Sequence, residues 1–252
     1  FGIPISKARE VYAQAAHLPG LQVVGIDVHI GSQLTELAPF EAAFSKVAEL
    51  TEQLRADGHT ITRLDLGGGL GIPYTRSNEA PPLPLDYGAL IKRTLGHLGC
   101  EIEIEPGRLI SGNSGVLVSE VIYVKQGEDR TFLIVDAAMN DLIRPAFYDS
   151  YHEIVSLTRR NGVPLSSDVV GPVCETGDFL GKRRDLPPTR PGDLLAVLAA
   201  GAYGASMASN YNSRRRPAEA LVDGAAARIV RTRETFDQLL QNEVPDAEPF
   251  VP

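Results

Sequence analysis

Segments with the pattern of strands and segments with the pattern of helices alternate along the first hundred residues. Residues 21–30 (LQVVGIDVHI) form a β-branched apolar run that ends at a glycine, which predicts a buried strand. Residues 40–58 then place apolar side chains at helical spacing. A strand at 61–66, a helix at 87–99 and a strand at 101–105 follow. This alternation predicts a parallel sheet, because parallel strands need a crossover between them.

The length of the repeat favours one architecture. Units of about 30 to 40 residues are typical of a (β/α)8 TIM barrel, which takes about 250 residues in all. Here the region before Gly112 supplies only three strands, and the sequence opens on a helix. We therefore expect residues 1–112 to be the C-terminal portion of such a barrel, and the chain to be the C-terminal part of a longer protein.

The pattern changes after Gly112. Residues 115–126 and 131–138 predict a β-hairpin around a GED turn, and an amphipathic helix is predicted at 234–243. Four further strand-like segments lie between them, at 152–160, 167–175, 193–204 and 219–231. We expect residues 113–245 to form an antiparallel β-domain, a sandwich or small barrel, with a terminal helix. The predicted fold class is therefore α/β plus β.

The composition restricts the partners and the compartment. A formal net charge of −8 disfavours nucleic acid as the main partner, and we interpret the arginine run 214–216 as a solvated loop. No apolar run approaches the roughly 18 residues of a membrane span, and we expect no signal peptide. Two cysteines, Cys100 and Cys174, make no disulfide framework, so we expect a cytoplasmic location.

Polar groups gather where the three predicted barrel strands end, at the edge where barrel enzymes place their sites. The sequences there are HIGSQ (29–33), DLGGGLG (65–71) and EPGR (105–108). Adjacent glycine N–H groups form phosphate-binding nests, although three glycines are as often a flexible turn. Glu105 and Arg108 are either a local ion pair, or an acid for a heterocyclic nitrogen and a cation for an anion.

His29 closes one of these strands. A single histidine there is more often structural, but with Gly31 and Ser32 behind it the imidazole can lie on a ring while the hydroxyl holds a phosphate. The chain's histidines show no metal-ligand spacing, so we predict no metal site. A phosphate nest, an acid and a ring-stacking imidazole together indicate pyridoxal 5'-phosphate (PLP).

A second motif, GPVCETGD (171–178), sets Cys174 beside Glu175. Taken alone, a cysteine is more often a small buried hydrophobe than a reactive thiol, and Cys100 keeps that interpretation. For Cys174 the alternative is a thiol and a carboxylate held together at a reaction centre.

Six motifs occur in an order that resembles one family: HIGSQ, DLGGGLGI, EPGRLISGNSG, NDLIRPAFY, GPVCETGD and GAYG. They are similar to the diaminopimelate decarboxylases, which are fold-type III, alanine-racemase-like PLP enzymes. Ornithine and arginine decarboxylases share that fold but usually carry aspartate after the cysteine, so Glu175 favours the diaminopimelate branch. The ornithine/arginine class stays open as an alternative.

The resemblance implies roles for residues that hold the cofactor. His29 is expected to stack on the PLP ring, and Glu105 to bond the pyridine nitrogen and keep it protonated, so that the ring withdraws electrons. The other cofactor-binding residues that the resemblance implies are Ser32, Gly67, Gly68, Gly69, Pro106, Gly107, Arg108 and Tyr203.

The resemblance also implies roles toward an amino-acid substrate. Diaminopimelate has a second amino-acid end, for which Arg144 would hold the carboxylate and Glu175 the ammonium. Cys174 and His29 are the implied catalytic residues, with Cys174 donating or positioning a proton. The full set of implied substrate-binding residues is Arg108, Arg144, Tyr148, Glu175 and Tyr203. Arg144 and Tyr148 as surface groups of a loop are the alternative. In this family the Cys-Glu pair reaches into the other subunit's site, which implies a homodimer with shared active sites.

The implied reaction converts meso-2,6-diaminopimelate to L-lysine and CO₂, the last step of lysine biosynthesis. One feature departs from the family, which forms a Schiff base between PLP and a lysine on an early barrel strand. The lysines here are predicted in helices, beside the hairpin turn and in the loop GKRRD: Lys7, Lys46, Lys92, Lys125 and Lys182. We therefore expect this chain to be inactive alone. A non-catalytic regulator that dimerises with a full-length homologue is the other function class left open.

Overall fold

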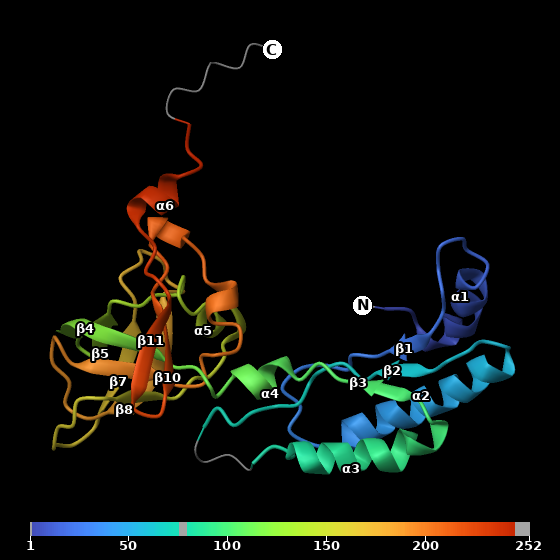
Figure 1. Cartoon of the computed structure of the whole chain (residues 1–252). Helices are drawn as coiled ribbons and strands as arrows, with labels where there is room; N and C mark the ends of the chain where they lie inside the picture. The colour runs from blue at the N-terminus through green and yellow to red at the C-terminus, as the bar shows by residue number, and fades with distance from the viewer. Residues whose placement is uncertain (1, 76–79, 245–252) are drawn as a thin grey trace. The chain divides into compact units, whose positions relative to one another are not determined.

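The computed structural model describes residues 2–75 and 80–244. The chain divides into two compact units, unit 1 (Phe1–Asn113) and unit 2 (Ser114–Pro252), and Figure 1 labels most of their helices and strands.

Strands and helices alternate in the described part of unit 1. They are α1 (Ala8–Ala15), β1 (Gly25–Asp27), α2 (Ala38–Ala56), β2 (Arg63–Asp65), α3 (Pro84–Leu95), β3 (Glu101–Glu103) and α4 (Gly107–Ser111), with short 3-10 turns at Ile5–Lys7 and Gly96–Leu98. The strands pair in parallel in the order β1-β2-β3, with Ile26 opposite Leu64 and Leu64 opposite Ile102. The predicted parallel sheet is confirmed.

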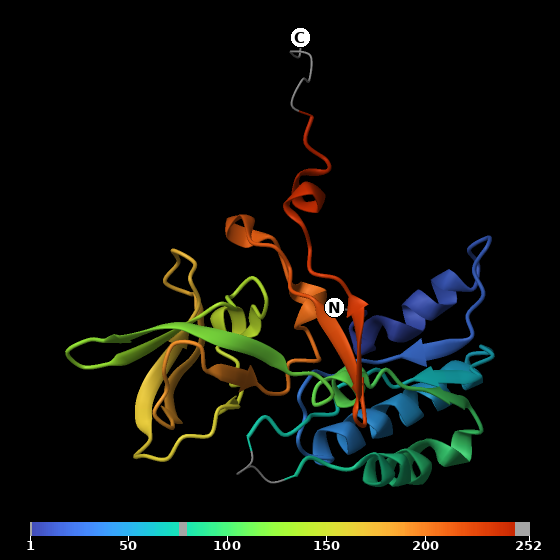
Figure 2. The ribbon, with the colours of Figure 1, turned by 60° about the vertical axis from the view of Figure 1, so that its left-hand side comes forward.

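Helices α2 and α3 lie together on one face of this sheet, as Figures 1 and 2 show. Phe40 and Phe44 of α2, Leu64 of β2 and Leu90 of α3 are fully buried between them. Burial there raises the pKa of Tyr87 to about 12. The helical spacing read from residues 40–58 thus marks the core face of α2 correctly.

The strands of unit 1 are shorter than predicted. Only Gly25–Asp27 of the apolar run 21–30 pairs as a strand, and every residue of β3 is exposed, although we expected buried strands. The exposure of β3 follows from its position, because β1 and β3 are the two edges of a three-stranded sheet. Each has a partner on one side only.

Unit 2 is built around a six-stranded sheet. Its elements are β4 (Leu117–Gln126), β5 (Thr131–Val135), α5 (Arg144–Tyr148), β6 (Ile154–Ser156), β7 (Leu165–Val170), β8 (Phe179–Leu186), β9 (Leu194–Val197), β10 (Glu219–Asp223), β11 (Ala226–Arg231) and α6 (Phe236–Leu240), with 3-10 turns at Ala205–Met207 and Tyr211–Ser213. The sheet order is β6-β9-β4-β5-β7-β8.

This sheet curls until its first and last strands meet. A Cβ atom added to Gly181 of β8 would lie 2.9 Å from Cδ1 of Ile154 in β6. The curl encloses a core that includes Val121, Leu133, Leu180 and Leu195. The sheet is therefore nearly closed and barrel-like.

Two predictions for unit 2 need correction. The sheet is not purely antiparallel, because β5 and β7 pair in parallel while its other pairs are antiparallel. The segment GKRRD, predicted as a loop, lies inside β8. That strand bulges at Lys182 and Arg183, where the pairing register shifts and Arg183 adopts a φ of +52°. The buried Asp168 accepts the Arg183 N–H at 2.7 Å and so satisfies the displaced backbone.

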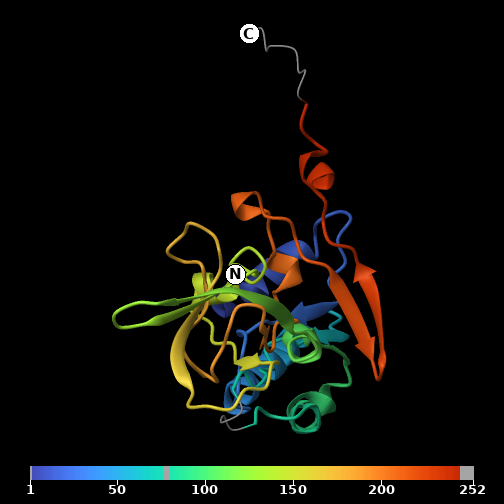
Figure 3. The same cartoon turned by 90° about the vertical axis from the view of Figure 1, so that its left-hand side faces the viewer.

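The hairpin β10–β11 forms a separate two-stranded sheet, which Figures 2 and 3 show projecting beside the six-stranded one. The terminal helix α6 is shorter than the predicted 234–243, and a capping box fixes its start. Thr235 accepts the Gln238 N–H, and the Gln238 side chain accepts the Thr235 N–H. Within the described ranges, no helix is long and apolar enough to cross a membrane.

Candidate active site

Three segments of unit 1 converge just beyond the strand ends. Backbone pairing continues past the strands, with Leu66 N–H donating to Glu103 O at 3.0 Å and Glu105 N–H donating to Gly67 O at 2.8 Å. Val28 N–H likewise donates to Asp65 O at 3.0 Å. The predicted motifs HIGSQ, DLGGGLG and EPGR are therefore neighbours at one edge of the sheet.

The glycines make this convergence possible. A Cβ added to Gly68 would meet Glu105 O at 2.4 Å, and one added to Gly67 would meet Val28 O at 2.5 Å. Gly67 and Gly69 also have φ values of +64° and +111°, which L side chains rarely adopt. The GGG segment, residues 67–69, is buried or nearly so. It is therefore packed against the neighbouring strand ends rather than a loose turn, and we call it the GGG crossing.

Two of the glycine N–H groups donate to side chains of unit 1. Gly67 N–H donates to Asp65 Oδ1 at 2.9 Å, and Gly68 N–H donates to Nδ1 of His29 at 3.3 Å. The second bond leaves the proton of a neutral His29 imidazole on Nε2 and fixes the orientation of an exposed ring. Sequence reasoning assigned these N–H groups to a phosphate nest. Here those of Gly67 and Gly68 orient neighbouring side chains.

Arg108 connects the first and third segments. It lies in the first turn of α4, and its Nη2 donates to Ser32 Oγ at 2.9 Å. A second guanidinium N–H donates to the hydroxyl of Tyr74, which sequence reasoning missed. Because the Ser32 oxygen accepts from both Nε and Nη2 of Arg108, its hydroxyl proton can still be donated. Glu105, which precedes Pro106, is exposed.

In unit 2, Arg144 is buried rather than a surface group. It opens α5 and is only 7% exposed, while Tyr148 at the end of α5 is exposed. Arg144 Nη1 lies 2.9 Å from Nε2 of the buried His152, whose Nδ1 lies 2.9 Å from Leu198 O. A carbonyl only accepts, so Nδ1 donates and Nε2 accepts from the arginine. His152 therefore fixes the Arg144 guanidinium, a role that the sequence did not indicate.

Cys174 and Glu175 occupy a turn beside α5, residues 174–178, here called the CETGD turn. Both side chains are exposed, and a Cβ at Gly177 would lie 3.8 Å from the Cβ of Ala146 in α5. Tyr211 donates its hydroxyl to Glu175 Oε2 at 3.2 Å, and this bond raises the pKa of Tyr211. The turn, α5 and Tyr211 thus form one cluster in unit 2.

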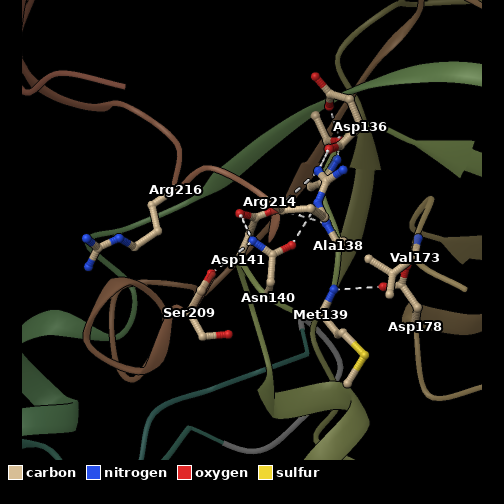
Figure 4. A network of polar contacts seen from close by, with 12 residues as sticks. Asp136, Ala138, Met139, Asn140, Asp141, Val173, Asp178, Ser209, Arg214 and Arg216 are labelled. Carbon is tan, nitrogen blue, oxygen red and sulfur yellow. Dashed lines mark hydrogen bonds and ion pairs between the residues drawn. The ribbon is translucent and has the colours of Figure 1, made fainter. Parts of the chain in front are cut away.

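The arginine run 214–216 is not the solvated loop that we predicted. Arg214 donates to Asn140 Oδ1 at 2.9 Å and lies 3.8 Å from Asp141 Oδ2, as Figure 4 shows. Arg215 stacks on the ring of Phe236, and Arg216 pairs with Glu234 at 3.0 Å. Arg214 thus fastens the segment that carries Tyr211 to the NDLIRP segment, while Arg215 and Arg216 hold it to residues 234–236.

The remaining predicted residues are placed as follows. Tyr203 is 42% exposed, with a φ of +59°. Cys100 is half-buried in unit 1, and its sulfur lies 3.1 Å from Arg55 Nη2. The lysines lie in the 3-10 turn Ile5–Lys7 and in α2, α3, β4 and β8, and none of them directly follows β1, β2 or β3 in the sequence. No group of metal-ligating side chains occurs among the described residues.

Known proteins are similar to this chain in sequence and in fold. A family model described as "Pyridoxal-dependent decarboxylase, C-terminal sheet domain" matches residues 11–201. The chain is 49% identical over 244 residues to diaminopimelate decarboxylase of Neisseria meningitidis and 52% identical over 241 residues to that of Haemophilus influenzae. These alignments cover 97% and 95% of this chain, and 59% and 57% of the relatives.

A solved structure agrees with these alignments. The crystal structure of diaminopimelate decarboxylase from Helicobacter pylori complexed with L-lysine matches with a TM-score of 0.89 at 40% identity. The match covers 96% of this chain and 59% of that one. The chain thus spans less than two thirds of the length of each of these proteins.

Proposed function

Because this chain belongs to the pyridoxal-dependent decarboxylase family, we propose that it supplies the substrate-selecting part of a diaminopimelate decarboxylase. The reaction is the conversion of meso-2,6-diaminopimelate to L-lysine and CO₂, the last step of lysine biosynthesis. One observation carries the proposal, namely identity near one half to two diaminopimelate decarboxylases over nearly the whole chain.

The cluster in unit 1 fits PLP in its donor chemistry. PLP presents a phosphate, a pyridine nitrogen and a flat ring, and when bound it withdraws the electrons left on the substrate carbon as CO₂ departs. The Ser32 hydroxyl and the fixed cation of Arg108 suit the phosphate. The exposed Glu105 carboxylate suits a protonated ring nitrogen, and the oriented imidazole of His29 suits the ring face.

The glycines contribute space and main chain to this site. Gly67, Gly68 and Gly69 let the strand ends approach one another, as the absent Cβ atoms require. In the proposal, the main chain at Gly69, Pro106 and Gly107 and the hydroxyl of Tyr203 complete the phosphate site.

The cluster in unit 2 suits the second amino-acid end of diaminopimelate. Arg144, held by His152, binds its carboxylate, and Glu175, held by Tyr211, binds its ammonium. Tyr148, Arg108 and Tyr203 complete the substrate site in this proposal. Ornithine ends in an ammonium without that carboxylate, so it cannot make the charge-assisted bonds that Arg144 is proposed to offer at this end of the substrate.

Cys174 has the proposed role of giving, from Sγ, the proton that replaces the lost carboxylate, or of positioning that proton. The enzyme is proposed to be a cytoplasmic homodimer in which the Cys174/Glu175 pair of one subunit completes the site of the other. Sedimentation of the active enzyme that finds only monomers would remove this part of the proposal. Unit 1 is proposed as the C-terminal portion of the PLP-binding (β/α)8 barrel, with its boundary near residue 112, and unit 2 as the C-terminal β-domain.

A chimera tests the proposal without any assumption about the rest of this protein. The segment of the Haemophilus influenzae relative that matches this chain is replaced by this chain, and the relative supplies the remainder. In a strain without its own diaminopimelate decarboxylase, the chimera should restore growth without lysine. The matched Glu175→Gln chimera should restore growth poorly or not at all. If the chimera accumulates as folded protein but gives no growth, while the parent relative does, the proposal is wrong.

A further inference from the structure

Asp178, at the end of the CETGD turn, uses both of its carboxylate oxygens inside unit 2. The residue is only 4% exposed. Oδ1 accepts the Met139 N–H at 2.7 Å, and Oδ2 accepts the Val173 N–H at 2.7 Å. Figure 4 shows this carboxylate between the two segments. It links the turn to the residues that lead into α5.

The main chain of Asp178 closes the same turn. Its N–H donates to Glu175 O at 3.0 Å, and its carbonyl accepts the Gly171 N–H at 3.2 Å. A Cβ at Gly171 would meet the two Asp178 carboxylate oxygens at 2.4 and 2.6 Å, so the glycine leaves the space that the carboxylate occupies. The main chain is therefore held in place just before Cys174 and Glu175, at Gly171 and Val173, and just after them, at Asp178.

Only a carboxylate satisfies this position. Each oxygen faces an N–H donor, and an asparagine would turn an NH₂ group toward one of them, which leaves two donors opposed in a buried place. Burial raises the pKa of Asp178, while the bonds from Met139 and Val173 act against that rise. Asp178 holds residues 139–141 through the Met139 N–H, and Arg214 holds the same segment through a hydrogen bond to the Asn140 side chain.

We infer that Asp178 is a positioning residue that fixes the CETGD turn against the 139–141 segment and so sets where Cys174 and Glu175 are presented. This inference rests on the proposed function of those two residues. It adds a residue that touches neither the substrate nor PLP and acts through the turn.

The reactivity of Cys174 reports the turn directly, without any enzyme activity. In this chain, with Cys100→Ser to leave one thiol, the rate of reaction with an aromatic disulfide reagent is compared between Asp178 and Asp178→Asn. A loosened turn should raise the Cys174 rate several-fold. The matched control is Asp193→Asn, which removes another buried carboxylate of unit 2, paired with Arg160 at 2.7 Å, and should leave the rate unchanged.

Gly171→Ala provides a second variant if Asp178→Asn does not fold, since the added Cβ displaces the same carboxylate and also meets the Cα of Ala138, which precedes the 139–141 segment, at 2.7 Å. An unchanged Cys174 rate in a folded Asp178 or Gly171 variant, or an equal rise in Asp193→Asn, overturns the inference.

In the chimera, Asp178→Asn should lower kcat/KM for meso-diaminopimelate by about 100-fold, the loss typical of a displaced catalytic group. Its affinity for PLP, followed by absorbance, should stay unchanged. A chimera that is inactive before substitution counts against the proposed function alone, because the thiol measurement stands apart from it.

Discussion

Tyr211 shows how a single hydroxyl can set the direction of a carboxylate, here that of Glu175, which is proposed to bind the substrate. Its bond to Glu175 joins residues 36 positions apart in the chain. Tyr211→Phe removes that bond and keeps the ring. For the chimera we expect KM for meso-diaminopimelate to rise about fivefold, the effect of one exposed charge-assisted hydrogen bond, with little change in kcat.

Tyr123→Phe is the matched control for this measurement. Tyr123 is an exposed tyrosine of β4, on the six-stranded sheet. Steady-state kinetics should show no change in that variant. An unchanged KM in Tyr211→Phe means that Glu175 is oriented by other contacts.

The site residues that could be predicted from the sequence are those in local motifs, whereas those that act through contacts with distant residues could not. His29, Ser32, Glu105 and Arg108 stand in short motifs at strand ends, and the strand pattern predicts that such ends meet. His152 and Tyr211 lie in no such motif. His152 reaches Leu198 across 46 positions, and only the curled sheet brings such residues together.

Among the elements, the GGG crossing between β2 and α3 has the strictest steric requirement. Gly68→Ala would place a Cβ 2.4 Å from the Glu105 carbonyl, which is backbone and cannot rotate away. We expect it to lower the unfolding free energy of this chain by about 2 kcal/mol, measured with denaturant. The same change in the chimera should weaken PLP binding at least tenfold, because the three strand ends must separate.

Gly88→Ala is the control within the same unit. Gly88 lies inside α3, and an added Cβ would meet nothing within 4 Å. Alanine there should stabilise the chain by about 0.5 to 1 kcal/mol, since glycine is a poor helix former. Equal effects of the two substitutions would show that the crossing is not sterically tight.

The elements also show where sequence patterns suffice. Helix α2 is predictable because its apolar residues repeat at helical spacing and Gly58, with a φ of +94°, follows its end. Strand β8 was missed because Lys182 and Arg183 form a bulge that interrupts the alternation of faces. The parallel pairing of β5 with β7 depends on the path of the chain between them, which no local pattern encodes.

At the scale of the whole molecule, each unit carries one half of the proposed chemistry. In the proposal, unit 1 supplies most of the groups for PLP, and unit 2 adds the Tyr203 hydroxyl. Unit 2 supplies most of the groups for the second end of diaminopimelate and the proton transfer, and unit 1 adds Arg108. The sequence predicted this division through the order of its motifs. The chain spans less than two thirds of its relatives, so activity is tested in the chimera that completes it.

The most direct test is the decarboxylation stoichiometry of the purified, PLP-loaded chimera with meso-diaminopimelate, ornithine and arginine, each offered separately. Released CO₂ and the amino-acid product are measured together. The account predicts one CO₂ and one L-lysine for each diaminopimelate consumed, with at most trace CO₂ from the other two. Turnover of ornithine or arginine with diaminopimelate untouched would contradict it.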